Sequence, residues 1–307
     1  IGSGFTADFS NNNVKNGLGI VISGSSADSN IIGGSGKGNT IIGNDDGIKI
    51  ENGANNNLIY GNNIGISFNG DFAVGNTSSG ILIDGAGSLG NKIGAPGLGN
   101  TISNNDYGIT LAGSASGNFI QDNYIGLSGD GTFSDMGNTI AGVLITGAGT
   151  DNNKVGGVAT NEGNYIGYNL EGIWLSDQSS SSVIDGNYIG LHPNGLDTMS
   201  NSNHGIKVDL GADNNNIGSC SVGNYISFNG IGIEFKGSGF DQDTVMGNKI
   251  GLNNISGDAG NSSEGLRFSY GAAGVVVGDI LTGCGNEIAF NGEGVATDIS
   301  NGNNNNN

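Results

Sequence analysis

A short signature, Gly-Asn-x-Ile or a close variant, recurs through almost the whole chain. Its Asn falls at nine positions: Asn39, Asn62, Asn100, Asn123, Asn164, Asn187, Asn224, Asn248 and Asn286. The gaps between them are 23, 38, 23, 41, 23, 37, 24 and 38 residues, so short and long units alternate. Such self-similarity indicates stacked repeats, because each unit can bury its apolar face only against its neighbours.

Each unit carries three signatures: Gly-Asn-x-Ile, Gly-Ile-x-Ile and Asn-x-Ile or its equivalent. All three are too short for a helix and alternate apolar with polar residues, which is typical of strands. The Gly, Asn and Asp between them supply the positive φ that tight corners require. The outer residues of each signature point inward, so we expect a core of stacked Ile, Leu and Val, with Asn ladders at the corners. The pattern predicts an all-β, single-stranded parallel β-helix, a solenoid of about ten coils with three short strands in each.

The repeats divide the 307 residues into one domain without a linker. Two-coil repeats are expected near 30–94, 95–156, 157–218 and 219–278, with partial repeats at 1–29 and 279–307. The 62 Gly and the low charged fraction of 12% could indicate disorder, but the regular Ile, Leu and Val argue against it. The first residue, Ile1, aligns with the middle of a coil, and Asn303–Asn307 follow the start of another. We therefore expect a segment of a longer protein; the alternative is a natural cap of polar Asn.

The acidic composition limits the partners. The net charge is −19, from 28 acidic against 9 basic residues. Nucleic acids and anionic membrane surfaces would be repelled. The chain has no run of 18 apolar residues, so no membrane insertion is expected.

The motif GNYIG at 163–167 and 186–190 and the motif GNTI at 38–41 and 99–102 resemble a known class of coil. They resemble the right-handed parallel β-helix repeats of the pectate-lyase-like superfamily, of the Asn/Gly-rich type found in bacterial cell-surface and secreted proteins. The resemblance covers the whole chain and implies a right-handed solenoid in an extracellular or cell-surface location. Parallel crossovers favour the same hand. These motifs carry no information about activity.

Polysaccharide lyases and hydrolases share this fold, so their catalytic groups were sought directly. Asp45 and Asp46 form a carboxylate pair, but the equivalent corners of other repeats hold at most one carboxylate and lie about 10 Å apart. His192 and His204 are both expected in one long corner, and Arg267 has only Glu264 nearby in sequence. We expect no enzyme. The alternative is a polysaccharide lyase, a glycoside hydrolase or a phage tail-spike-like depolymerase.

No cofactor is expected, and calcium is the one metal left open. The calcium candidates are Asp71, Asp130 and Asp258, which lie beside Gly and Asn in long corners. Their oxygen ligands suit calcium, although the spacing of an EF-hand is missing. The alternative is that each Asp stabilises a turn through its own side chain.

Cys220 and Cys284 occupy the same corner of successive long coils. Two coil spacings separate them by about 10 Å, whereas a disulfide needs Cα atoms within about 7 Å. Either both corners lean over the shorter coil between them and form a disulfide, or the two thiols are free.

The outward position of the first strand reads Thr40, Asn63, Thr101, Tyr124, Tyr165, Tyr188, Tyr225, Lys249 and Glu287. The four Tyr should form a ladder at the strand spacing of about 4.8 Å. It could serve only to stabilise the sheet. Alternatively, the phenol faces could form a platform for sugar rings, walled by Asp130, Asp135, Asp197 and His192 from the long corners.

These features together favour a non-catalytic structural or adhesive β-helix: a stalk, fibre or adhesin segment of a bacterial surface protein. The expected partners are neighbouring copies or further coils stacked end to end, together with cell-surface glycans at the tyrosine column.

Overall fold

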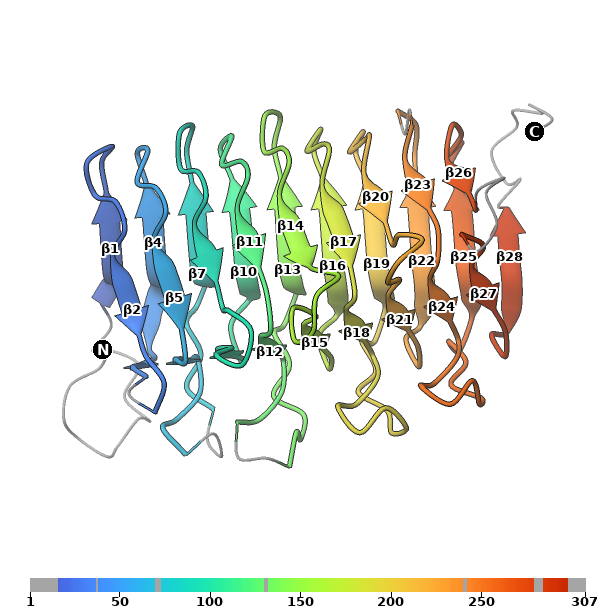
Figure 1. The fold of residues 1–307 in the computed structure, drawn as a ribbon, viewed down its shortest axis with the longest axis horizontal. Coiled ribbons are helices and arrows are strands. Elements are labelled where there is room, and N and C mark those ends of the chain that lie inside the picture. The colour runs from blue at the N-terminus through green and yellow to red at the C-terminus, as the bar shows by residue number, and fades with distance from the viewer. Residues whose placement is uncertain are drawn as a thin grey trace.

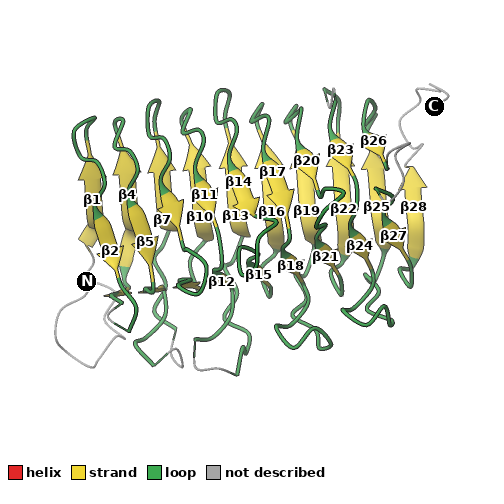
Figure 2. Cartoon of the chain, in the orientation of Figure 1, coloured by secondary structure: helices red, strands yellow, loops and turns green. Residues whose placement is uncertain are grey.

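The described strands form nine coils of three strands each and the first strand of a tenth, stacked along one axis (Figure 1). The computed structural model describes residues 16–36, 38–69, 73–129, 132–239, 242–278 and 284–297. Every strand pair within the three sheets is parallel, and no helix occurs among the described residues (Figure 2). The same residues therefore contain no helix that could cross a membrane. The predicted right-handed parallel β-helix is confirmed.

The strands of one position in the coil form one sheet. Sheet I consists of β3 (Thr40–Ile41), β6 (Asn63–Ile64), β9 (Thr101–Ile102), β12 (Tyr124–Ile125), β15 (Tyr165–Ile166), β18 (Tyr188–Ile189), β21 (Tyr225–Ile226), β24 (Lys249–Ile250) and β27 (Glu287–Ile288). Sheet II consists of β1 (Asn16–Ser23), β4 (Asn44–Glu51), β7 (Ser79–Asp84), β10 (Tyr107–Ala112), β13 (Ala141–Thr146), β16 (Glu171–Ser176), β19 (His204–Asp209), β22 (Ile231–Lys236), β25 (Glu264–Ser269) and β28 (Glu293–Thr297). Sheet III consists of β2 (Ile31–Gly33), β5 (Leu58–Tyr60), β8 (Lys92–Ile93), β11 (Phe119–Ile120), β14 (Lys154–Gly156), β17 (Val183–Asp185), β20 (Asn216–Ile217), β23 (Thr244–Val245) and β26 (Val276–Val277).

The core is a set of aliphatic columns, one coil above the next. Ile125 and Ile166 pair in sheet I, Ile48 and Ile81 in sheet II, and all four are fully buried. The parallel register keeps identical positions in contact, because a side-chain period of two sends the same residue of every strand inward. Each fully buried Ile contributes roughly 1.5–3 kcal/mol relative to an exposed one.

An asparagine ladder runs along each of the three corners. In each rung the backbone N–H and the side-chain amide of one Asn donate to Oδ1 of the Asn in the next coil, as Asn164 does to Asn187 at 3.1 and 2.9 Å. Ladder 1, between sheets III and I, is Asn39, Asn62, Asn100, Asn123, Asn164, Asn187, Asn224, Asn248 and Asn286. Ladder 2, between sheets I and II, is Asn16, Asn44, Asn76, Asn105, Asn138, Asn169, Asn201, Asn229, Asn261 and Asn291. Ladder 3, between sheets II and III, is Asn30, Asn57, Asn91, Asn118 and Asn153, followed by Ser182, Asn215 and Asp243.

Ladders 1 and 3 follow the predicted Asn-containing signatures, whereas ladder 2 was not predicted. Its Asn residues precede the Gly-Ile-x-Ile strands and belong to none of the three signatures. The ladders satisfy polar groups at every bend, which matters because a buried amide without a partner is costly.

The extra residues of the long coils lie in two corners. The corner from sheet I to sheet II forms a small antiparallel excursion, closed in successive long coils by bridges such as Leu127 to Asp135 and Leu191 to Thr198. A glycine opens it: Gly126 has a φ of 88°, and a Cβ there would collide with the carbonyl oxygen of Gly167 in the next coil. These excursions all project from the same side of the solenoid (Figure 1).

Cys220 and Cys284 form a disulfide, with Cα atoms 4.4 Å apart. Between them lies the tight turn of a short coil, whose Gly247 donates its N–H to the carbonyl oxygen of Cys284 at 3.1 Å. The same bond pattern joins Gly61 to Gly99. The long corners therefore lean over the short coil, and the first of the two cysteine alternatives is the one found.

Candidate functional site

Four tyrosines stack in a column on the outer face of sheet I. Tyr124, Tyr165, Tyr188 and Tyr225 begin consecutive strands and pair in register. Successive ring centroids are 5.4, 4.9 and 5.2 Å apart, and the ring planes lie within 18° of parallel. This spacing follows the separation of parallel strands, so the predicted ladder is present.

The two ends of the column are also covered. The ring of Phe133 stacks on Tyr124 with centroids 5.4 Å apart, and Nζ of Lys249 lies 5.1 Å from the ring centroid of Tyr225. The ring faces are therefore occupied by neighbouring side chains, contrary to the prediction of a platform of open phenol faces. A ligand on this column would meet ring edges and hydroxyl groups.

Three tyrosines of the column, Tyr124, Tyr165 and Tyr188, have a raised pKa. Burial raises the pKa of Tyr165 to about 12, and the neighbouring Tyr188 and Tyr124 add to the shift. Burial also raises the pKa of Tyr124, with a contribution from the negative charge of Asp122, and the pKa of Tyr188. At physiological pH these hydroxyls are hydrogen-bond donors as well as acceptors.

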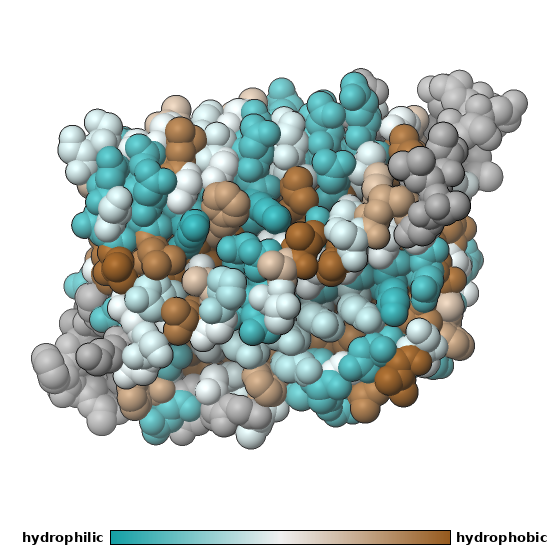
Figure 3. Space-filling model, in the orientation of Figure 1, coloured by the Kyte–Doolittle hydropathy of each residue, from teal (hydrophilic) through white to brown (hydrophobic). Residues whose placement is uncertain are grey.

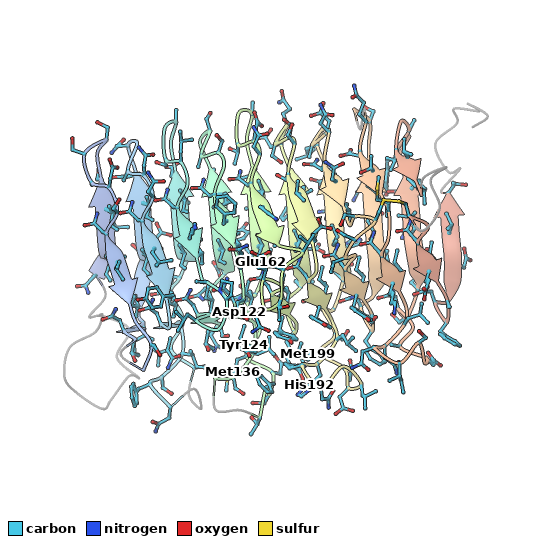
Figure 4. The ribbon with its side chains drawn as sticks, in the orientation of Figure 1. Asp122, Tyr124, Met136, Glu162, His192 and Met199 are labelled. Carbon is cyan, nitrogen blue, oxygen red and sulfur yellow. A yellow bond between two sulfur atoms is a disulfide. The ribbon has the colours of Figure 1, made fainter. Side chains whose placement is uncertain are left out.

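Two long corners lie beside the tyrosine column, in the region labelled in Figure 4. Phe133 of residues 126–140 contacts His192 of residues 190–203 edge to face, with centroids 5.2 Å apart. This contact links the two corners to each other and to Tyr124. His192 therefore lies where the sequence placed it, but its ring packs against Phe133.

Two of the acidic residues predicted to wall the column, Asp135 and Asp197, accept hydrogen bonds within their own long corners. Oδ1 of Asp135 accepts from the N–H of Gly137 at 3.1 Å, and Oδ2 of Asp197 accepts from the side-chain amide of Asn194 at 2.6 Å. Burial raises the pKa of Tyr168, and the charges of Asp135 and Asp197 add to it, so both carboxylates lie near Tyr168. Asp130 lies outside the described residues.

Asp258, like Asp135, accepts a hydrogen bond from the backbone N–H two residues later in the chain. Its Oδ1 accepts from the N–H of Gly260 at 3.1 Å, which is the side-chain turn given above as the alternative to calcium binding. The other two calcium candidates, Asp71 and Asp130, lie outside the described residues. Within the residues that are described, no group of three His, Cys, Asp or Glu side chains is placed to hold a metal ion.

The carboxylate pair Asp45 and Asp46 is engaged by the next coil. Oδ1 of Asp45 accepts from the hydroxyl of Thr77 at 2.9 Å, and Oδ1 of Asp46 accepts from the N–H of Ser79 at 3.0 Å. Both therefore help to fix β4 against β7.

A charged cluster on sheet II was not predicted. His204 is the first residue of β19, and not part of the long corner with His192 as expected. Its Nδ1 lies 2.7 Å from Oε2 of Glu171 in β16, and its Nε2 lies 2.9 Å from Oε2 of Glu234 in β22. All three side chains are buried, with 6–7% of their surface exposed.

The two carboxylates raise the pKa of the His204 imidazole. Burial alone would lower its pKa, but the hydrogen bonds to Glu171 and Glu234 outweigh this and raise it. Burial tends to raise the pKa of Glu234, yet the contacts with His204 and Ser269 lower it overall. Arg267 Nε, 3.5 Å from Oε1 of Glu234, extends the cluster beyond the Glu264 expected from the sequence. The only sequence signal was the charged residue that opens EGIWL and HGIKV at equivalent positions.

No protein-family model matches the chain, and no curated protein is significantly similar to it.

Proposed function

We propose that the chain is a non-catalytic structural and adhesive β-helix: a stalk, fibre or adhesin segment of an extracellular bacterial surface protein. The observation that carries the proposal is the continuity of the three sheets and of ladders 1 and 2 across the described coils. At the corners of ladders 1 and 2 each Asn is bonded to the next, so adjacent coils are linked at more than one place around the cross-section. The resemblance of GNYIG and GNTI to coils of secreted bacterial β-helices in the pectate-lyase-like superfamily agrees with this role.

The disulfide supports an extracellular location. Disulfides persist in oxidising compartments and are rare where thiols are kept reduced. The Cys220–Cys284 pair is formed, and the described residues contain no free cysteine.

The absence of catalysis is proposed from how the acidic groups are used. Glu171 and Glu234 are the carboxylates best placed beside an imidazole. Both are buried, and each is bonded to His204 between them. A general acid or base must reach the proton that it transfers. Incubating the protein with neutral and acidic polysaccharides tests this: we expect no new reducing ends and no unsaturated products. Cleavage that is lost in Glu171→Gln or Asp46→Asn would establish the polysaccharide-active alternative instead.

End-to-end stacking is the second part of the proposed role. The last described coil exposes apolar side chains, with Val276 at 51%, Val277 at 43% and Val295 at 54%, and among the described strands β28 has a partner on one side only. An open sheet edge of this kind pairs with another strand. We expect β28 to be covered by a further coil of the same kind, either of a longer chain or of a neighbouring copy. A rod whose scattering profile is independent of concentration, with β28 protected from hydrogen exchange, would support the longer chain; growth of its length with concentration would support the copy.

The tyrosine column is the proposed adhesive surface. It presents a row of neutral hydroxyl groups and ring edges, which suits a hydroxyl-rich, partly apolar ligand such as a glycan. The face of the molecule in Figure 3 mixes hydrophilic and hydrophobic residues. Glycan titration of the protein and of Tyr165→Ala and Tyr188→Ala variants tests the surface. Weaker binding is the expected result; unchanged binding with lowered stability would leave the column a structural ladder.

A further inference from the structure

A cleft of about 400 Å³ opens at the corner between sheets III and I, beside the first two tyrosines of the column. Its walls include Ser35 and Gly36 on one side, Gly97 on the other, and Asp122, Tyr124 and Tyr165. It forms because the long corners project beyond the tight turns of the short coils between them. Figure 4 shows Asp122 next to Tyr124 at this corner.

Asp122 supplies the one acidic group of this wall. It sits in a tight turn with a φ of 57°, and its backbone N–H donates to the carbonyl oxygen of Glu162 in the next corner at 3.2 Å. Oδ2 accepts from the N–H of Gly97, which ties the carboxylate to the rim. Burial raises the pKa of Asp122, against the lowering effect of backbone N–H groups. The side chain is half-buried and keeps acceptor capacity, because a carboxylate offers about four lone-pair positions.

Tyr124 and Tyr165 supply neutral hydroxyl groups and ring edges beside this carboxylate, because their faces are stacked on each other. Glycines keep the rim open. A Cβ added to Gly36 or to Gly97 would meet no atom within 4 Å, so a ligand can approach the backbone there.

We propose that this cleft binds one unit of a saccharide that carries no acidic group. Sugar hydroxyls donate to the carboxylate of Asp122 and exchange hydrogen bonds with the hydroxyls of Tyr124 and Tyr165. None of the described residues that line the cleft is cationic, and the chain has a net charge of −19, so we expect uronic and sialic acids to be rejected. The inference rests on the proposed adhesive role of the tyrosine column and narrows it to one end of that column.

Tyr→Phe variants test the location, because phenylalanine keeps the stack and removes only the hydroxyl. Binding is measured by calorimetric titration with cellohexaose, maltohexaose, mannohexaose and N-acetylchitohexaose as neutral probes, and with oligogalacturonate and hyaluronan oligomers as acidic probes. We expect at least one neutral probe to bind, and Tyr124→Phe and Tyr165→Phe to weaken it by about three- to tenfold, as for the loss of one hydrogen bond. The matched controls Tyr188→Phe and Tyr225→Phe, in the same column outside the cleft, should bind as the native protein does.

Two further variants test the cleft itself. Gly97→Asn adds a side chain that tolerates the φ of 75° found there, and should block the cleft and abolish binding without a change in melting temperature. Asp122→Asn removes the charge and should reduce the discrimination against acidic probes.

The outcomes separate this inference from the proposed function. Equal weakening in all four Tyr→Phe variants would place the ligand along the whole column, so the adhesive role would stand and the cleft would be wrong. Acidic probes that bind as well as neutral ones would also overturn the cleft proposal. Binding of no probe would overturn both the cleft proposal and the adhesive role. The structural role would then be tested separately, by the scattering profile of the rod.

Discussion

Asp243 occupies the place of an asparagine in ladder 3, and the ladder is imperfect around it. Oδ1 of Asp243 accepts from the N–H of Asn215 at 2.6 Å, but Oδ2 has no partner, and neither do Nδ2 of Asn215 and Oγ of Ser182 in the preceding coils. Burial raises the pKa of Asp243 to about 7. A single residue thus makes the interior of the solenoid sensitive to pH.

Replacing Asp243 with Asn should raise the stability, and more so at higher pH. In the native protein the unfolded chain ionises near pH 3.8 but the folded one only near pH 7, so the free energy of unfolding falls as the pH rises between these values. Asp243→Asn should remove this fall and be more stable above pH 7 by roughly 2–4 kcal/mol, at 1.36 kcal/mol per pKa unit. Urea denaturation from pH 4 to pH 8 measures it, with the exposed Asp177→Asn as control. Equal stability of Asp243→Asn and native protein at pH 8 would contradict the prediction.

His204 should also lose stability as the pH rises, but only above pH 6.5. Its raised pKa gives stability that is complete below pH 6.5 and is lost as the pH rises through the folded value. The lowered pKa of Glu234 gives stability that is complete above pH 4.5 and is lost as the pH falls through the folded value. The cluster therefore stabilises most between about pH 4.5 and 6.5.

His204→Gln should cost about 3–5 kcal/mol in that window, because two buried carboxylates lose their cation. The cost should shrink on the alkaline side, where the native histidine loses its proton. Denaturation midpoints across the pH range measure it, and His192→Gln, in a long corner, is the matched control. A cost that does not vary with pH would mean that packing, and not charge, holds the cluster.

At the scale of the element, the corners hold successive coils together more than single strands do. The strands of sheet I have only two residues each, whereas every rung of ladder 1 adds a pair of hydrogen bonds between coils. The covalent bond between Cys220 and Cys284 works in the same direction, across the short coil that contains Gly247.

Removing that disulfide should lower the free energy of unfolding by about 2–4 kcal/mol. The bond links residues 64 positions apart, so it restricts a long loop in the unfolded chain. Urea denaturation of Cys220→Ser/Cys284→Ser, and of the native protein with a reductant, should agree. A variant as stable as the native protein would show that the last coils are held by their ladders and core alone.

At the scale of the molecule, the two-coil repeat is the structural unit. Strand pairing involves nearest-neighbour coils only, and the long corners also contact the next long corner, as Phe133 contacts His192. Stability should then be close to a sum over repeats and their interfaces.

Deleting residues 157–218, one complete repeat, should leave a folded and shorter rod. The deletion joins Gly156 to Ser219, which occupies the place that Gly157 has in the native chain, so the register is restored. Circular dichroism should keep its strand signal, and small-angle scattering should show a rod shorter by about 10 Å, two strand spacings. Deleting 157–187, a single short coil with part of a corner, is the control, and it should unfold or aggregate because short and long coils no longer alternate. A deletion of 157–218 that fails to fold would refute the additive description.

The sequence by itself determined the period of the coils, the three strands in each, the aliphatic columns and two of the three ladders. These follow from local rules: a side-chain period of two fixes what faces inward, and Gly and Asn fix where the chain turns. The tertiary structure decided the features that depend on how each coil is positioned against its neighbours. The disulfide forms because long corners bend over a short coil. The pKa of His204 is raised because Glu171 and Glu234 come from the coils on either side, and the tyrosine faces are closed because the rings stack on one another. Ladder 2 escaped prediction for the same reason, since its Asn residues belong to no local signature and acquire their role only from the coil above and the coil below.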